Sequence, residues 1–259
     1  MTSFDPSSAF ASGTFRPHPH PAPILAMLRS QGRIEATLFL RHGEQLLLSF
    51  IIPLCMLLAA ATLPLLPDPK SLQAAFPVIL AVAAMSSGFT GQAIALAFDR
   101  RYGALKRIGA SGVPAKVIII GKIIGLLIVA TFQVCVLSLV AYGLGWHVAM
   151  PGFLLGLGVF FVGVASFTSL GMFMGGTLPS ELVLGLANLI WVVFVGAASY
   201  VVFSISAYPA WLITIPSVAL AEGIHGAFQG SIPLSSFISL GLWMLVGVVC
   251  ASRWFKFAD

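Results

Sequence analysis

The stretch AIALAFDRRYGALKRIGASGVPAKVIIIGKIIG, residues Ala93–Gly125, places a short basic segment between two apolar runs. Its middle part, Asp99–Lys116, holds five of the 13 Lys and Arg residues of the chain within 18 positions. Basic residues gathered beside apolar runs are typical of loops that stay on the cytoplasmic side of a membrane. The stretch therefore indicates two membrane spans joined by a cytoplasmic loop.

The composition is that of an integral membrane protein. The 259 residues are 59% hydrophobic and only 8% charged, whereas a soluble domain carries roughly 25% charged residues. The apolar runs are continuous and lack the alternation of β-barrel strands. Because only helices and closed barrels satisfy their backbone in lipid, we predict an all-α membrane bundle. The net charge of +5 is attributed to membrane orientation and not to a nucleic-acid partner.

Six apolar runs are long enough to cross a bilayer, which takes about 20 residues. We predict spans at residues 45–66, 76–98, 117–146, 152–177, 182–206 and 235–252. The third and fourth runs are longer than a span requires, so these helices are expected to tilt or to extend beyond the bilayer.

The basic residues are distributed very unequally between the two sides of the predicted spans. With the N-terminus in the cytoplasm, only Lys70 falls outside, and 12 basic residues fall inside. These 12 are Arg16, Arg29, Arg33, Arg41, Arg100, Arg101, Lys106, Arg107, Lys116, Lys122, Arg253 and Lys256. Lys122 falls within the third span, where its side chain is expected to extend back to the headgroups.

The cytoplasmic loop after the second span has an internal pattern of its own. Tyr102, Leu105 and Ile108 recur at three-residue steps, which predicts one face of a short helix, with basic residues elsewhere on it. Gly109 and Gly112 are expected to end this helix. Such an amphipathic helix suits a groove in a partner protein, and it suits the headgroup region of the membrane equally well.

The chain before the first span divides into two parts. Residues 1–22 are Pro-rich and are predicted to be disordered. Residues 23–44 are predicted to form an amphipathic interfacial helix, although Gln31 and Glu35 interrupt its apolar face. The residues expected to lie on its polar side or at the turn into the first span are Arg29, Arg33, Arg41 and Glu44.

Polar residues inside the spans have two interpretations. Ser87, Thr90 and Asn188 either form hydrogen bonds between helices or line a translocation cavity. Small residues spaced by four, as at Gly121–Gly125 and Gly171–Gly175, predict close helix packing within the chain before contact between two copies.

The segment from Tyr208 to Pro233 is too polar and too interrupted to form a full span. We predict that it enters the outer leaflet as short re-entrant helices, with Pro209 and Pro216 breaking them. Glu222 and His225 are three residues apart and are expected to pair on one face of a helix. No metal site is predicted, because no ligand set with metal spacing is present.

Three stretches occur in an order that resembles one known family. The first span is preceded by RHGEQLLLSFIIP, which begins at Arg41. The second and third spans are joined by FDRRYGALKRIGAS, which begins at Phe98. The last span is preceded by IPSVALAEGIHG, which begins at Ile215. This order resembles the permease subunits of type-two ABC exporters, which include bacterial drug, polysaccharide and lipid exporters.

The resemblance implies six transmembrane helices, a second permease copy as a homodimer partner, and a separate ABC ATPase that docks on the loop after span two. The implied ATPase contacts are Arg100, Arg101, Tyr102, Leu105, Lys106, Arg107 and Ile108. Glu222 and His225 fall in the segment that caps the extracellular exit. The chain has no GxxxxGK[ST] motif, so it is expected to bind no cofactor, and ATP and Mg²⁺ are expected on the partner subunit.

The leading hypothesis is therefore a non-enzymatic transport subunit of the bacterial cell membrane, with both termini, including residues 253–259, in the cytoplasm. The implied substrate is a drug, a lipid or a lipid-linked glycan moved out of the cytoplasm or inner leaflet. The alternative is a membrane scaffold that docks a cytoplasmic partner without transport. A lipid-modifying enzyme is the least favoured hypothesis, because no catalytic group of His, Asp and Glu appears.

Overall fold

The computed structural model of the protein describes residues 22–41, 43–62, 71–110, 112–203 and 208–256. Within these ranges the regular structure is entirely helical. The elements are α1 (Ile24–Arg41), α2 (Gly43–Thr62), α3 (Ser71–Met85), the π-helical η2 (Ser86–Gly91), α4 (Gln92–Arg101), α5 (Ala104–Ala110), α6 (Ala115–Gly143), α7 (Met150–Thr177), α8 (Ser180–Phe203), the 3₁₀-helical η3 (Ala210–Thr214), α9 (Pro216–Phe228) and α10 (Leu234–Trp254).

Five continuous helical stretches are long and apolar enough to cross a membrane, so the predicted all-α fold is confirmed at that level. They are residues 72–101, 116–143, 150–177, 180–203 and 234–254. The helix in the first predicted span, α2, has a shorter described apolar part, Ser49–Thr62. The sixth span stays a prediction. Residues 1–21, the last four residues of the first predicted span (63–66), residues 204–206, residues 257–259 and the side chain of Glu44 lie outside the described residues.

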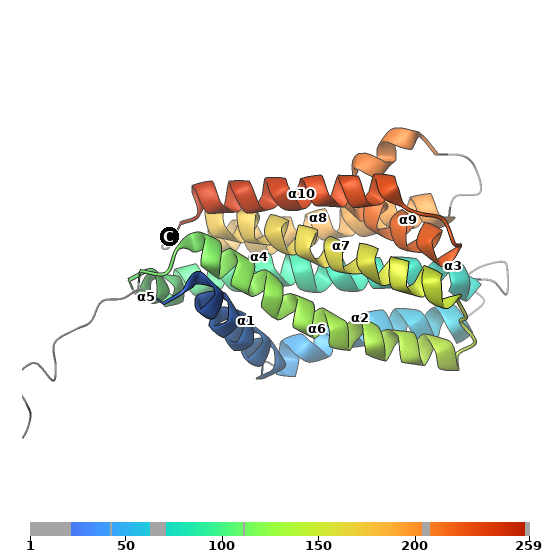
Figure 1. Ribbon diagram of the computed structural model, residues 1–259, viewed down its shortest axis with the longest axis horizontal. Coiled ribbons are helices and arrows are strands. Elements are labelled where there is room, and N and C mark those ends of the chain that lie inside the picture. The colour runs from blue at the N-terminus through green and yellow to red at the C-terminus, as the bar shows by residue number, and fades with distance from the viewer. Residues whose placement is uncertain (1–21, 42, 63–70, 111, 204–207, 257–259) are drawn as a thin grey trace, which may run out of the picture.

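The long helices lie side by side, and the short elements gather at the two ends of the bundle (Figure 1). Helix α5 lies at one end, with the C-terminal end of α10 and the start of α1 near it; this is called the α5 end. Helix α9 and the start of α3 lie toward the opposite end, called the α9 end. The described chain therefore returns to the α5 end after its last long helix.

The third predicted span ends earlier than expected. The helix α6 stops at Gly143, and Gly145 turns the chain with φ +93°. Trp146, predicted to be the last residue of the span, lies beyond the helix and is buried. Its indole packs against two phenylalanines. The centroid of the indole lies 4.5 Å from that of the Phe76 ring and 5.1 Å from that of the Phe228 ring. A glycine that adopts a positive φ ended the helix although the apolar pattern continued.

A π-helical segment that the sequence did not predict interrupts the second span. Gly171 and Gly175 of α7 pack directly on its backbone and on that of the following turn, next to the carbonyls of Phe89 and Ala93 respectively. A Cβ atom at Gly171 would stand 2.5 Å from the Phe89 oxygen. The spacing of four between the two glycines therefore serves packing within the chain, because only glycine allows the two backbones to approach so closely.

The close approach of α7 and α4 gives a direct test of the fold. The variant Gly175→Ala is expected to lower the free energy of unfolding by about 2 kcal/mol, because its methyl group meets the fixed carbonyl of Ala93. The control Gly241→Ala, in α10, meets no atom within 4 Å and is expected to leave stability unchanged or slightly higher. Unfolding by denaturing detergent would measure both variants. Equal stability of the two would contradict the packing described here.

Candidate functional site

The short helix α5 and the turn before it form the candidate site at the α5 end. The turn at Gly103, with φ +71°, separates Tyr102 from α5, so the predicted single helix through Tyr102 is wrong. Tyr102 is 71% exposed and stacks on Phe98 of α4. Gly109, expected to end the helix, lies within it, and Gly112, with φ +79°, turns the chain toward α6.

The seven predicted ATPase contacts fall into two groups. The exposed group comprises Arg101, Tyr102, Lys106 and Arg107. Arg100 is only 3% exposed, Leu105 is 1% exposed, and Ile108 is partly buried. A partner protein cannot contact a buried side chain, so Arg100 and Leu105 are corrected from partner contacts to internal residues. Leu105 packs in an apolar cluster with Leu96 and Ile118.

Arg100 joins the end of α4 to the end of α7. Its Nη1 donates hydrogen bonds to the carbonyl oxygens of Gly175 and Leu178, at 2.9 and 3.0 Å. The last carbonyls of a helix have no partner within the helix and carry partial negative charge, which favours a cation there. The backbone N–H of Lys256 donates to the neighbouring carbonyl of Gly176 at 3.0 Å. The C-terminal turn of α7 is thus held from two sides.

Arg101 makes a second connection from α4 to the start of α8. Its Nη1 lies 2.6 Å from Glu181 Oε1 and 3.4 Å from Ser180 Oγ. Both side chains of this ion pair are exposed, so solvent screens it strongly. The pair therefore orients the exposed guanidinium and contributes little to stability.

The predicted interfacial helix α1 packs closely against α6, and small residues permit the contact. A Cβ atom at Gly125 of α6 would stand 2.6 Å from Glu35 Cβ and 3.0 Å from the carbonyl oxygen of Gly32. Gly121 of α6 lies equally close to the Gln31 side chain. Gln31 and Glu35, which interrupt the apolar pattern of α1, are thus the residues that meet α6.

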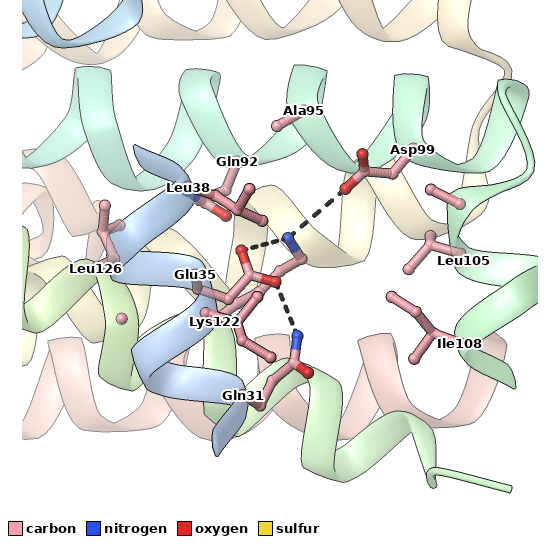
Figure 2. A pocket seen from close by; sticks show the side chains of 13 residues that line it. Gln31, Glu35, Leu38, Gln92, Ala95, Asp99, Leu105, Ile108, Lys122 and Leu126 are labelled. Atoms are coloured by element: carbon pink, nitrogen blue, oxygen red, sulfur yellow. Dashed lines mark hydrogen bonds and ion pairs between the residues drawn. The ribbon is translucent and has the colours of Figure 1, made fainter. Parts of the chain in front are cut away.

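Lys122 lies at this crossing and forms an ion pair inside the protein (Figure 2). Its Nζ lies 2.8 Å from Glu35 Oε2 and 3.7 Å from Asp99 Oδ2. Gln31 Nε2 donates to the other Glu35 oxygen at 2.9 Å. The lysine side chain is 6% exposed, so the expectation that it extends back to the headgroups is wrong. The carboxylates of Glu35 and Asp99 take the place of water around the Lys122 ammonium group.

The remaining predicted residues of α1 point outward. Arg29, Arg33 and Arg41 are exposed, which leaves them accessible to lipid phosphates or to a partner. That these three arginines contact lipid or a partner stays a prediction.

The three predicted cavity residues are scattered, and none of them lines the cavity between α1, α4, α5 and α6 or the apolar cavity beside Phe89 and Trp243. Ser87 is buried and donates to the Ala83 carbonyl, and Asn188 is exposed and donates to the Leu184 carbonyl. The Thr90 hydroxyl is buried without a hydrogen-bond partner among the described residues. An apolar cavity of about 640 Å³ lies elsewhere, between Phe89, Phe173, Phe194 and Trp243.

Glu222 and His225 of α9 do not pair with each other among the described residues. His225 Nε2 lies 2.7 Å from Gln229 Nε2, and Glu222 accepts a hydrogen bond from the Tyr208 hydroxyl. Burial and this carboxylate raise the pKa of Tyr208 to about 12. The expected pair is therefore corrected to two separate contacts, one of which ties the chain before η3 to α9. Whether this segment enters the outer leaflet stays a prediction.

Together, the fold and the polar anchors at the α5 end define a multi-pass helical membrane protein with a basic surface loop fixed to its long helices. A family model described as ABC-2 type transporter matches residues 30–229. The chain belongs to this family, and the resemblance seen in the sequence is confirmed. The matched domain is a transmembrane component and not a nucleotide-binding domain. No curated protein matched the sequence.

The two adjacent arginines of α4 provide a matched pair of variants. Arg100→Met leaves the buried carbonyl of Gly175 and the partly buried carbonyl of Leu178 without this donor and is expected to lower the free energy of unfolding by about 3 kcal/mol. Arg101→Met removes only an exposed pair and is expected to change stability little. Unfolding by denaturing detergent at low and high salt would measure both. Equal effects of the two variants would contradict the assigned role of Arg100.

Proposed function

We propose that this chain is the permease subunit of an ATP-driven exporter, with a separate ATPase docked on the exposed residues around α5. The observation that carries the proposal is that exposed basic residues on this loop follow directly on α4, whose buried Arg100 is bonded to α7 and whose Asp99 pairs with Lys122 of α6. Tyr102, Lys106 and Arg107 present the contact surface. Rigid attachment lets a displacement of the loop reach the long helices instead of being lost locally.

The proposed orientation places the α5 end in the cytoplasm. The described basic residues lie on α1, on α4 and α5, at the start of α6 and at the end of α10. Such an excess of Lys and Arg is expected on the cytoplasmic side. Helix α1 begins at the α5 end and α3 begins toward the α9 end (Figure 1), so α1 and α2 together carry the chain from one end of the bundle to the other, which supports α2 as a sixth crossing. The proposed location is the bacterial cell membrane.

The proposed assembly is a homodimer in which α8 faces the second copy. Asn188 is an exposed amide on a helix that otherwise presents Leu189, Val192 and Val193 outward. A polar side chain facing acyl chains is costly, whereas one at a contact between copies or on a path is not. The transported molecule is proposed to be hydrophobic or amphipathic, such as a drug, a lipid or a lipid-linked glycan.

The docking surface is tested by reversing two exposed charges. In Lys106→Glu/Arg107→Glu, like charges replace complementary ones at the contact, so ATP hydrolysis that co-purifies with the chain is expected to fall at least about tenfold. The chain would be tagged and affinity-purified in mild detergent from the cells that produce it, and its ATPase rate measured. Arg253→Glu, an exposed charge at the end of α10, is the control and is expected to retain the activity.

The same experiment separates transport from scaffolding. An ATPase whose rate does not depend on the permease indicates the scaffold alternative. Absence of any ATPase with the wild-type chain contradicts the docking proposal. Size-exclusion chromatography shows whether each variant remains folded.

The dimer is tested by cross-linking in membranes. In a background with Cys55, Cys135 and Cys250 replaced by Ala, the variant Asn188→Cys is expected to give an oxidised dimer of two chains. Leu139→Cys, on the exposed side of α6, is the control and is expected to stay monomeric. A dimer formed only by the α6 variant would contradict the assignment of α8.

A further inference from the structure

The apolar cavity of about 640 Å³ is walled by α7, α8 and α10, by Phe89 of η2 and by the turn from η3 into α9. No ionisable side chain is among the described residues that line it. Thr177, Thr214 and Trp243 carry the only polar side-chain groups of this lining. The volume is that of a ligand pocket, so the fate of these polar groups decides what the cavity accepts.

The three polar groups of the lining are already bonded within the protein. Thr177 Oγ1 donates to the Phe173 carbonyl at 2.7 Å, and Thr214 Oγ1 donates to the Trp211 carbonyl at 2.8 Å. The indole N–H of Trp243 donates to the Thr214 carbonyl at 2.7 Å. A buried water molecule needs several polar partners, and an empty space forfeits van der Waals contacts. The lining therefore favours an apolar occupant over water.

The cavity has the depth of one membrane leaflet. Thr177 at the end of α7 lines it near the α5 end, and Trp243 in the middle of α10 lines it at the opposite limit. Helix α10 continues from Trp243 to Trp254 at the α5 end, which is about 16 Å at 1.5 Å per residue. The hydrocarbon core of a bilayer is about 30 Å thick, so this distance is close to half of it.

The cavity reaches the surface of the bundle beside α8, on the side away from Asn188. Ile190 and Ala197 line the cavity. At 3.6 residues per turn, both fall on the side of the helix opposite Asn188. Val193, which also lines the cavity, is 60% exposed. A dimer contact through Asn188, as proposed above, therefore leaves the opening of the cavity facing lipid.

A cation lies at the limit of the cavity near the α5 end. The backbone N–H of Lys256 donates to the carbonyl of Gly176 at 3.0 Å, and Gly176 directly precedes Thr177 of the lining. The Trp254 ring packs against Phe173 of the lining, with centroids 6.2 Å apart. The side chain of Lys256 is exposed. A lysine at a membrane surface attracts the phosphates of lipids.

We propose that this cavity holds one acyl chain of a membrane phospholipid from the leaflet at the α5 end, with the lipid phosphate beside Lys256. The chain packs between α7, α8 and α10, and the hydrogen-bonded contact of Trp243 with Thr214 limits how deep it extends. The second acyl chain of the lipid stays in the bilayer. This site rests on the dimer face proposed above, which leaves it open to lipid, and it does not depend on the ATPase docking.

Retained lipid tests the site directly. The full-length protein would be extracted in uncharged maltoside detergent from membranes that contain phosphatidylethanolamine and phosphatidylglycerol, and the phospholipid retained per chain counted by native mass spectrometry. Ala197→Phe and Val193→Phe each place a ring in the space of the chain and are expected to lower retention about tenfold. Val249→Phe is the control outside the cavity and is expected to have no effect. It starts from a valine of matched exposure, 59% against 60% for Val193.

Thermal stability separates a filled cavity from a damaged fold. After removal of lipid, Ala197→Phe is expected to melt at a higher temperature than wild type, because its ring occupies space that the lost chain leaves empty. Added phosphatidylglycerol is expected to raise the melting temperature of wild type and to raise that of the variant much less. If Ala197→Phe melts below wild type both with and without lipid, the same two measurements on Val193→Phe decide.

The position of the headgroup is tested at the α5 end. Lys256→Gln removes the cation beside the cavity and is expected to lower phospholipid retention about fivefold. Lys116→Gln, an exposed lysine at the start of α6, is the matched control and is expected to change nothing. Equal retention by Lys256→Gln and Lys116→Gln would overturn the placement of the phosphate.

Two results would overturn the proposal as a whole. One is phospholipid retention that neither Ala197→Phe nor Val193→Phe lowers relative to Val249→Phe. The other is retention by wild type of an apolar molecule that is not a phospholipid and that Ala197→Phe loses, because the cavity then serves a different ligand. ATPase activity is not part of any of these readouts, so failure here is distinct from failure of the docking proposal.

Discussion

The guanidinium of Arg100, held by the last carbonyls of α7, is the interaction on which the arrangement of the α5 end depends. A charge this deeply buried is tolerated only where acceptors replace water, and the unpaired carbonyls of a helix C-terminus provide them. Gly171 and Gly175 are a precondition, because they let α4 approach α7 closely enough for the arginine to reach. Two interactions therefore hold the loop in place: the close packing of α7 on the backbone of η2 and α4, and the hydrogen bonds of the Arg100 guanidinium.

A second anchor acts from the other side of α5. Lys122, Glu35 and Asp99 connect α6, α1 and α4, and the glycines of α6 allow α1 to lie against it. The helix that presents Lys106 and Arg107 directly follows α4, whose Arg100 and Asp99 contact α7 and α6 respectively. Helix α5 itself is held by Leu105, which packs in an apolar cluster with Leu96 and Ile118. Under the proposed function, a force on α5 would be divided between α7 on one side and the α1–α6 pair on the other.

Neighbouring residues of one type have opposite roles here, which limits what a pattern can predict. Arg100 and Arg101 are adjacent and both fit a basic cytoplasmic loop, yet one is internal and the other exposed. Leu105 fits the apolar face of a docking helix, but that face is already covered by Leu96 and Ile118. In the sequence, Gln31 and Glu35 only interrupt the apolar face of an amphipathic helix. In the structure, Glu35 pairs with Lys122 of α6, and Gln31 donates a hydrogen bond to Glu35. The side of a helix that a partner can reach depends on neighbours distant in sequence.

The sequence by itself determined the class of protein, the five long spans, the family and the basic loop. Apolar runs and clustered basic residues are local properties of the sequence, and they decide directly which segments enter a bilayer and which stay beside it. It also predicted that Gly121, Gly125, Gly171 and Gly175 serve packing. Only the tertiary structure decided which backbone each glycine meets, that Lys122 is ion-paired instead of hydrated, and that Gln92 and Asp99 share a cavity. Those outcomes depend on contacts between residues far apart in the sequence, such as Lys122 and Glu35, which are 87 positions apart, and a local sequence pattern does not contain that information.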